Sequence, residues 1–143
     1  AQTAPPGPLL FPMAKAGSYE CLCKKVGFEV TGEPAMACFC HCNHCQVYGG
    51  DAAHVAAWNP DSFKITKGES ELIKYEHTPK KFRHTCKSRG SFIHNTLPNG
   101  LQITPLGGMT FPGDKIKPTM HIFYKERCRD ATDDLPKHEG WPA

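Results

Sequence analysis

The stretch ACFCHCNHCQVYGG, residues 37–50, holds half of the chain's eight cysteines within eight consecutive positions. Two histidines stand between these thiols. The residues concerned are Cys38, Cys40, Cys42 and Cys45, with His41 and His44. A cluster this dense is typical of a disulfide framework, a metal site or a reactive thiol.

Alternate-residue spacing argues against disulfides. Cysteines stand two positions apart at Cys38 and Cys40, at Cys40 and Cys42, and again at Cys21 and Cys23. In a strand such residues point to the same side with Cα atoms about 6–7 Å apart, at or beyond the usual limit for a disulfide. A metal ion instead gathers thiolates at about 2.3 Å from itself. We therefore predict metal-bound or free thiols and a reducing, cytoplasmic compartment.

Cys40, Cys42 and Cys45 form the first candidate metal site. These thiols would come from the end of a strand and the first turn of a helix, where Cys42 and Cys45 share a face. Helix N-terminal amides would favour their thiolate form. Three protein ligands with a fourth position open are typical of a catalytic zinc, whereas a fourth protein ligand makes a structural site. The candidates for a closing ligand are His41, His44 and Cys86.

A second group consists of Cys21, Cys23 and Cys86. Its fourth ligand is expected three residues after Cys86, but that position in CKSRG is Arg89. Arginine cannot ligate because it stays protonated. The site is therefore incomplete, metal-free, or completed from elsewhere. The candidates for such a recruited ligand are His84, His94 and Cys128.

Short segments that alternate in polarity or read as apolar strands recur along the chain between Gly and Pro. They predict strands over residues 18–23, 26–32, 35–40, 54–59, 62–68, 71–77, 80–86, 91–97, 101–106 and 119–125. Two short helices are expected. One spans 43–48, with Asn43 as N-cap and Gly49-Gly50 as its stop, and the other spans 131–135. The pattern indicates a mostly β protein.

Composition limits the function classes. The 143 residues suit one domain with one core, and 39% hydrophobic and 22% charged residues are typical of a globular protein. A net charge of +3 without a basic stripe argues against nucleic-acid binding. No apolar run approaches the ~20 residues of a membrane span. Residues 1–13 are expected to be a flexible, proline-rich arm before a domain over 14–143.

Four segments together resemble the glutathione-dependent formaldehyde-activating enzyme family, which includes centromere protein V. They are GSYECLCKKVGFEV, CHCNHCQVYGG, FRHTCKSRGS and PTMHIFYKERCRDATDDLPKHEGWP. The resemblance extends over residues 17–142, and the ordered series of CxC, CHCxxC and P-x-x-H-I motifs is specific. The chain departs from the family at Arg89, where the family has a cysteine.

The resemblance implies a single small domain of coiled antiparallel β-sheets with zinc-binding cysteine motifs, similar to B-type methionine sulfoxide reductases. It implies a structural zinc at positions 21, 23, 86 and 89. It also implies an active-site zinc on Cys40, Cys42 and Cys45, near which glutathione or another thiol would bind. Because of Arg89, one or two zinc ions per chain are expected.

The expected function is a zinc-dependent carbon–sulfur lyase acting on a thiol adduct of a small carbonyl compound such as formaldehyde. Cys40, Cys42 and Cys45 would carry the catalysis. Two alternatives stay open: a different small-metabolite reaction on the same fold, such as isomerisation or dehydration, and a non-enzymatic zinc-bearing interaction module. The expected partner is a small thiol or carbonyl compound, for example glutathione. We expect no nucleic-acid or membrane partner, and a homo-oligomer is a possibility that the sequence leaves open.

Overall fold

A computed structural model of the chain describes residues 15–142. The arm predicted over residues 1–13 lies outside this range. Ten strands, one α-helix and three short 3-10 helices follow one another along the described residues. The strands are β1 Lys15–Glu20, β2 Gly27–Thr31, β3 Met36–Cys40, β4 Ala53–Trp58, β5 Phe63–Lys67, β6 Leu72–Thr78, β7 Lys81–Cys86, β8 Phe92–Thr96, β9 Gln102–Pro105 and β10 Met120–Ile122. The helices are α1 Asn43–Gly49, η1 Pro60–Ser62, η2 Glu69–Glu71 and η3 Tyr124–Glu126.

The strands form two sheets. The smaller sheet has the order β1-β2-β5, and the larger has the order β10-β3-β4-β9-β8-β7-β6. Every pairing is antiparallel except that of β10 with β3, which is parallel. The predicted mostly β, antiparallel fold is thus confirmed, with one parallel pair at the edge of the larger sheet.

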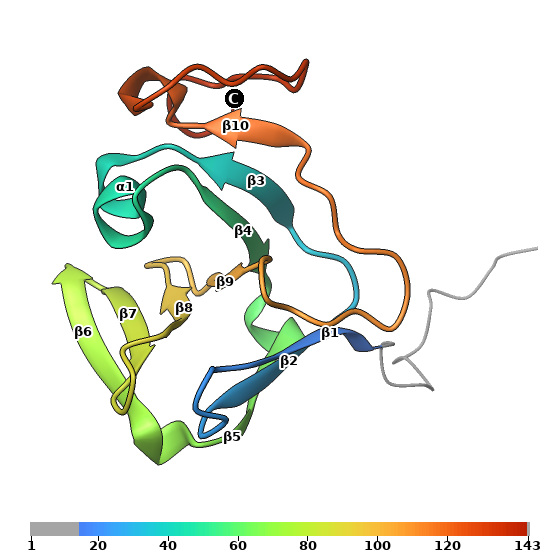
Figure 1. Cartoon of the computed structure of the whole chain (residues 1–143), viewed down its shortest axis with the longest axis vertical. Helices are drawn as coiled ribbons and strands as arrows, with labels where there is room; N and C mark the ends of the chain where they lie inside the picture. The colour runs from blue at the N-terminus through green and yellow to red at the C-terminus, as the bar shows by residue number, and fades with distance from the viewer. Residues whose placement is uncertain (1–14, 143) are drawn as a thin grey trace, which may run out of the picture.

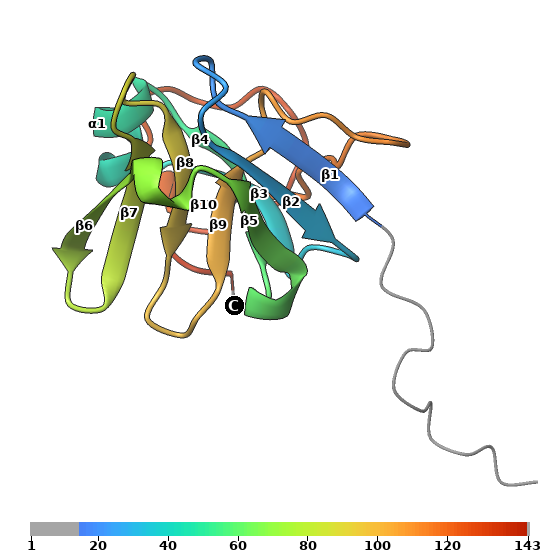
Figure 2. The ribbon, with the colours of Figure 1, turned by 90° about the horizontal axis from the view of Figure 1, so that it is seen from below.

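The larger sheet curls so that its two edges approach opposite sides of α1 (Figure 1). Side-chain contacts join the helix to the far edge: the rings of His44 in α1 and His77 in β6 meet with centroids 4.2 Å apart. The smaller sheet lies beside the larger one, away from α1 (Figure 2). The helix therefore covers one face of the larger sheet and leaves the other face to the core.

Alternation along the strands divides the side chains between these two faces. In β4, Ala56 and Trp58 join the main core with Phe28 of β2, whereas Val55 belongs to a smaller cluster with Cys38 of β3. The Trp58 Nε1–H donates to Thr104 Oγ1 at 2.9 Å, which pairs two fully buried side chains. The main core thus packs between the sheets, and the opposite face carries the cysteine-rich edge.

Helix α1 confirms the helix predicted over 43–48, but its N-cap is Cys42 and not Asn43. The Cys42 Sγ accepts the Cys45 N–H at 3.4 Å and so fills the capping role. Gly50 ends the helix in the left-handed region at φ 85°, as a glycine C-cap does.

Three other predictions are corrected. The first strand ends at Glu20, so Cys21 and Cys23 lie in the loop that follows, which Lys24 turns with a φ of 64°. The last strand stops at Ile122 because Phe123 adopts a left-handed conformation at φ 52°. Residues 131–135 form no helix. No helix in the described part of the chain is long and apolar enough to cross a membrane.

Candidate metal centre and cavity

Cys40 ends β3, Cys42 caps α1, and Cys45 lies in its first turn. Their sulfur atoms all lie within 4.8 Å of one another, and the Sγ atoms of Cys42 and Cys45 are 3.4 Å apart. A strand that turns directly into a helix therefore brings three thiols to one point, as the spacing predicts. We refer to Cys40, Cys42 and Cys45 as the first triad.

The three thiols of the first triad differ in pKa: that of Cys42 is lowered, and those of Cys40 and Cys45 are raised. Interactions with the thiols of Cys40 and Cys45, together with the hydrogen bond from the Cys45 N–H, place the pKa of Cys42 well below its usual range. The neighbouring Cys42 in turn raises the pKa of Cys40, and Cys40 and Cys42 both raise that of Cys45. Three thiolates this close repel one another, and a divalent cation is what allows them to coexist.

The C-terminal segment holds the first triad's backbone in place. The His41 N–H donates to the Ile122 carbonyl of β10 at 3.0 Å. The Gln46 side-chain amide donates to the carbonyls of His41 and Glu126, each at 2.7 Å. The loop that carries the triad is therefore fixed from both sides, which is the rigidity that a preformed metal site requires.

None of the three proposed closing ligands reaches the first triad. The ring of His41 bonds to His121, the ring of His44 bonds to His77, and Cys86 belongs to the second group. Within residues 15–142, the first triad has no fourth protein donor. This arrangement favours the open site over the closed one.

His41 instead begins a chain of hydrogen-bonded polar groups that runs through buried His121 to the exposed carboxylate of Asp133. Its Nε2 lies 2.8 Å from His121 Nδ1, and His121 Nε2 lies 2.9 Å from the Asp133 carboxylate. Because the carboxylate accepts the His121 Nε2–H, His121 Nδ1 is an acceptor and His41 donates to it. This chain ties residue 41, between two cysteines of the triad, to the C-terminal segment. His121 is thus a buried, hydrogen-bonded histidine on the edge strand β10.

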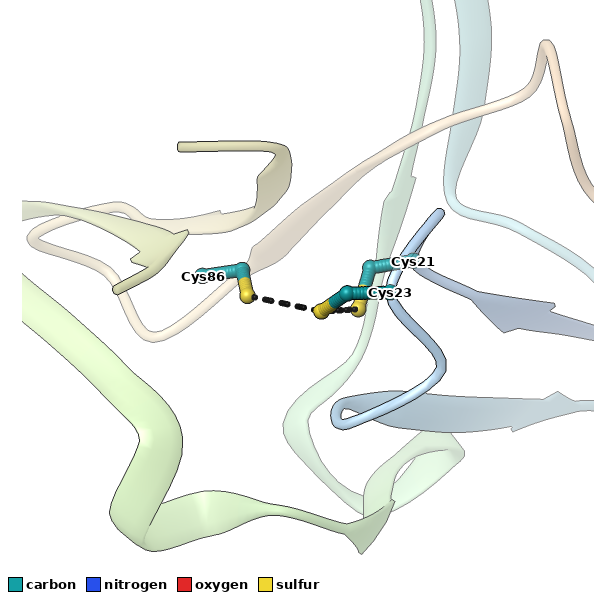
Figure 3. Close-up of side chains that lie close together, drawn as sticks. All are labelled: Cys21, Cys23 and Cys86. Atoms are coloured by element: carbon teal, nitrogen blue, oxygen red, sulfur yellow. Dashed lines mark hydrogen bonds between the residues drawn. The ribbon is translucent and has the colours of Figure 1, made fainter. Parts of the chain in front are cut away.

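The second triad consists of Cys21, Cys23 and Cys86 (Figure 3). The Sγ of Cys23 lies 3.4 Å from that of Cys21 and 3.4 Å from that of Cys86. The Val26 N–H donates to Cys21 Sγ at 3.3 Å. Burial opposes ionisation of Cys21, but this bond and those from neighbouring groups lower its pKa. Amide-to-sulfur bonds of this kind stabilise metal-bound thiolates.

The recruited ligands suggested for the second triad lie elsewhere. His84 and His94 stack on each other with ring centroids 3.9 Å apart, and Cys128 contacts Asp51. Arg89 is exposed in the turn after β7. Among the described residues, the second triad therefore has three protein donors and no fourth.

A cavity of about 400 Å³ opens beside the first triad. Its floor is the face of the larger sheet that α1 covers, and residues from six of its strands, together with α1 and the C-terminal segment, line it. The apolar lining includes Met36, Cys38, Val55, Ala57, Leu97, Ile103, Ile122, Phe123 and Trp141. Cys38 is 1% exposed and is not part of the triad, and burial raises its pKa to about 12. The triad thus faces a cavity with a largely apolar lining that is large enough for a small organic molecule.

Sequence reasoning missed the polar groups of this cavity. Arg83 and Asn95 line it from β7 and β8, and Tyr48 and Lys81 lie with them. The one signal in the sequence is the alternation of side chains along β7, which places Lys81 and Arg83 on the same face of the strand. Their meeting depends on the β7–β8 register, which local sequence does not specify.

The sequence profile described as glutathione-dependent formaldehyde-activating enzyme matches residues 17–126 of this chain. The chain belongs to this family. The family comprises enzymes that act on formaldehyde with glutathione, and the match includes every cysteine of both triads.

A solved structure with a similar fold is the crystal structure of a Rhodobacter sphaeroides protein, a structural genomics target. It is 17% identical, with a TM-score of 0.56, over 84% of this chain and 98% of that one. At this identity the likeness shows the fold alone. A search of curated proteins finds no significant match.

Proposed function

We propose that the chain is a zinc-dependent carbon–sulfur lyase that acts on the adduct of glutathione, or another thiol, with a small carbonyl compound such as formaldehyde. One observation carries the proposal: the sulfurs of Cys40, Cys42 and Cys45 converge, without a fourth donor from the described residues, at the side of a largely apolar cavity. Free thiols of this kind persist in a reducing compartment, so we propose the cytoplasm.

Zinc fits the first triad. Thiolate sulfur is a preferred zinc donor, and three thiolates with one exchangeable position match a catalytic site. When bound, zinc would supply a site for a substrate thiolate or for a carbonyl oxygen. Three anionic ligands make the metal a poor Lewis acid but a good partner for thiolate exchange, which favours sulfur chemistry over hydrolysis.

The reaction conserves all atoms. In the cleavage direction the carbon–sulfur bond of an S-hydroxymethyl thiol adduct breaks and its electron pair stays on sulfur. The hydroxyl proton passes to solvent or to that sulfur as the carbonyl forms. The reverse direction joins a thiol to the carbonyl carbon. Cys40, Cys42 and Cys45 would hold the centre, and the apolar walls, among them Val55 and Ile103, would exclude water and orient the two partners.

Cys21, Cys23 and Cys86 would hold a second, structural zinc between the β1–β2 loop and the end of β7. Its affinity is expected to be lower than that of a four-thiolate site, because Arg89 supplies no sulfur. The protein would then carry one firmly bound zinc and a second that is more easily removed.

Replacement of Cys42 by alanine tests the proposal. We expect loss of turnover with glutathione and formaldehyde and loss of one zinc per chain, because one of three ligands is removed. The fold should persist with a loss of about 1 kcal/mol, since the substitution also removes the N-cap of α1. Zinc content, circular dichroism and the rate of adduct formation measure these effects.

The matched control is Cys128→Ala, which removes an exposed thiol that lies outside both triads. This variant should keep the zinc and the turnover of the unmodified chain. Full activity of Cys42→Ala would contradict the proposal. A zinc-loaded, folded protein that turns over no thiol adduct would favour a different reaction or a non-enzymatic role.

A further inference from the structure

Arg83 is a buried cation without a buried anion. Its side chain lines the cavity from β7, and the residue is only 5% exposed. It forms no ion pair or hydrogen bond with another residue in the range 15–142, and its Nε is one of the buried polar atoms that lack a partner. An unpaired guanidinium in an apolar setting is costly and selects for an anion in that place.

Asn95 lies directly opposite Arg83 across the β7–β8 ladder, and both side chains therefore point to the cavity face of the sheet. Asn95 is 8% exposed, and its side-chain oxygen also lacks a hydrogen-bond partner. Two unsatisfied polar groups thus stand side by side in an otherwise apolar wall. Buried polar groups without partners are rare in folded proteins, so this pair points to a ligand.

The surroundings orient the guanidinium and add a second positive charge beside it. The ring of Tyr48 in α1 lies 3.9 Å from the guanidinium carbon of Arg83 and fixes the plane of the fork. Lys81, two residues earlier on the same face, adds a second positive charge to the cavity lining. The one carboxylate among the lining residues, that of Glu126, accepts the Asn43 N–H.

We propose that Arg83 and Asn95 form a carboxylate subsite within the cavity. The planar fork of Arg83 would receive the carboxylate in two parallel hydrogen bonds, and Asn95 would accept a hydrogen bond from a donor group on the same ligand. The ligand is then an organic acid with an apolar stem. That this acid is the substrate rests on the proposed function, because the other end of the ligand would then reach the first triad. The existence of the carboxylate subsite does not depend on the proposed function.

Binding of ligands without sulfur tests the subsite apart from the metal chemistry. Calorimetry would compare hexanoate, 1-hexanol and hexylphosphonate on the zinc-loaded protein. We expect hexanoate to bind about tenfold or more tightly than hexanol, because a site built to satisfy a polar group discriminates strongly against its absence. Tighter binding of the phosphonate than of hexanoate would overturn the carboxylate assignment.

Arg83→Gln should abolish the preference for hexanoate and leave hexanol binding unchanged, which also shows that the cavity is intact. Lys64→Gln is the matched control: it makes the same change of charge on an exposed residue of β5 that does not line the cavity, and should keep the preference. If Arg83→Gln fails to fold, Arg83→Lys retains the charge without the fork and should reduce the preference.

The two proposals fail in distinguishable ways. A preference for hexanoate that survives in Arg83→Gln, or its absence from the unmodified chain, overturns the subsite whatever the turnover. A preference that depends on Arg83 in a protein without lyase activity supports the subsite and contradicts the proposed function.

Discussion

His84 and His94 show how a single pair of side chains can make the protein sensitive to acid. They face each other across the β7–β8 ladder, with rings parallel to within 5°. Burial and the neighbouring His84 lower the pKa of His94 to about 4. The His94 Nδ1–H is satisfied by Gln102 Oε1 at 2.9 Å, which fits a neutral ring.

This pair predicts a loss of stability in acid. His94 titrates near pH 6.5 when unfolded and near 4 when folded, so the unfolded chain binds the extra proton first. Stability is therefore complete above about pH 6.5 and falls as the pH drops to 4, by at most about 3 kcal/mol. Urea denaturation across this range should show a shallower decline for His94→Gln.

The comparison of the two proteins isolates His94, because acid also protonates the thiolates of both triads in each of them. The unmodified chain and the variant should lose zinc over the same pH range. The free energy of unfolding should fall more steeply with decreasing pH in the unmodified chain than in the variant between pH 6.5 and 4. Identical slopes would show that His94 does not titrate as its burial requires.

Residue spacing predicted the first triad, because cysteines a few positions apart must lie close whatever the fold, whereas Cys86 joined the second triad through the family resemblance. Arg83 and Asn95 were beyond prediction. Their chemistry arises from burial and from the absence of partners, and both depend on which strands pair. From the sequence alone, a buried arginine on an alternating strand cannot be distinguished from an arginine that faces solvent.

At the scale of elements, the loop over residues 21–26 depends on Gly68. Gly68 follows β5 with a φ of 76°, and a Cβ there would lie 1.8 Å from the carbonyl oxygen of Lys25. Only backbone surrounds this position, so nothing can move aside cheaply. The close approach fixes the loop that carries Cys21 and Cys23.

Gly68→Ala should therefore destabilise the protein by more than about 2 kcal/mol, since it combines a backbone clash with a strained φ. It should also weaken metal binding at the second triad. Gly50→Ala offers a matched comparison, because Gly50 has a similar φ of 85° but open space around it.

The cost of Gly50→Ala is expected to be about 1 kcal/mol, the left-handed penalty alone. Chemical denaturation and zinc content of both variants measure these effects. Equal losses of stability in the two variants would show that the contact between Gly68 and Lys25 does not hold the loop.

Element boundaries were the weakest part of the sequence prediction. Residues 131–135 resemble a helix start, but the Asp133 carboxylate binds His121 and the Leu135 N–H instead. The last strand was predicted to be longer than it is because no turn-forming residue in the local sequence indicates the left-handed conformation of Phe123. Long-range contacts decided both regions, whereas the alternating strands in the middle of the chain were predicted correctly.

At the scale of the whole molecule, the second triad joins the two sheets. Cys21 and Cys23 follow a strand of the smaller sheet, and Cys86 ends a strand of the larger one. A metal bound there would stabilise the folded chain in proportion to its affinity, because it binds the folded state and not the unfolded one.

Arg89→Cys should restore the fourth sulfur and tighten zinc binding at the second triad by on the order of tenfold or more. The melting temperature in the presence of zinc should rise accordingly. Competition with a chelator and thermal denaturation with and without zinc measure these quantities. The control is Arg89→Ser, which removes the arginine without adding a thiol; equal behaviour of the two variants would contradict the prediction.

The parallel pairing of β10 with β3 has a consequence for biosynthesis. β3 and the first triad leave the ribosome about eighty residues before their partner strand. Phe123 and Trp141, whose rings meet edge to face with centroids 5.1 Å apart at the cavity, follow later still. The nascent chain thus carries its reactive thiols before it has the wall that shelters them. Translation of residues 120–141 is the step that adds this wall of the cavity to the cluster of cysteines.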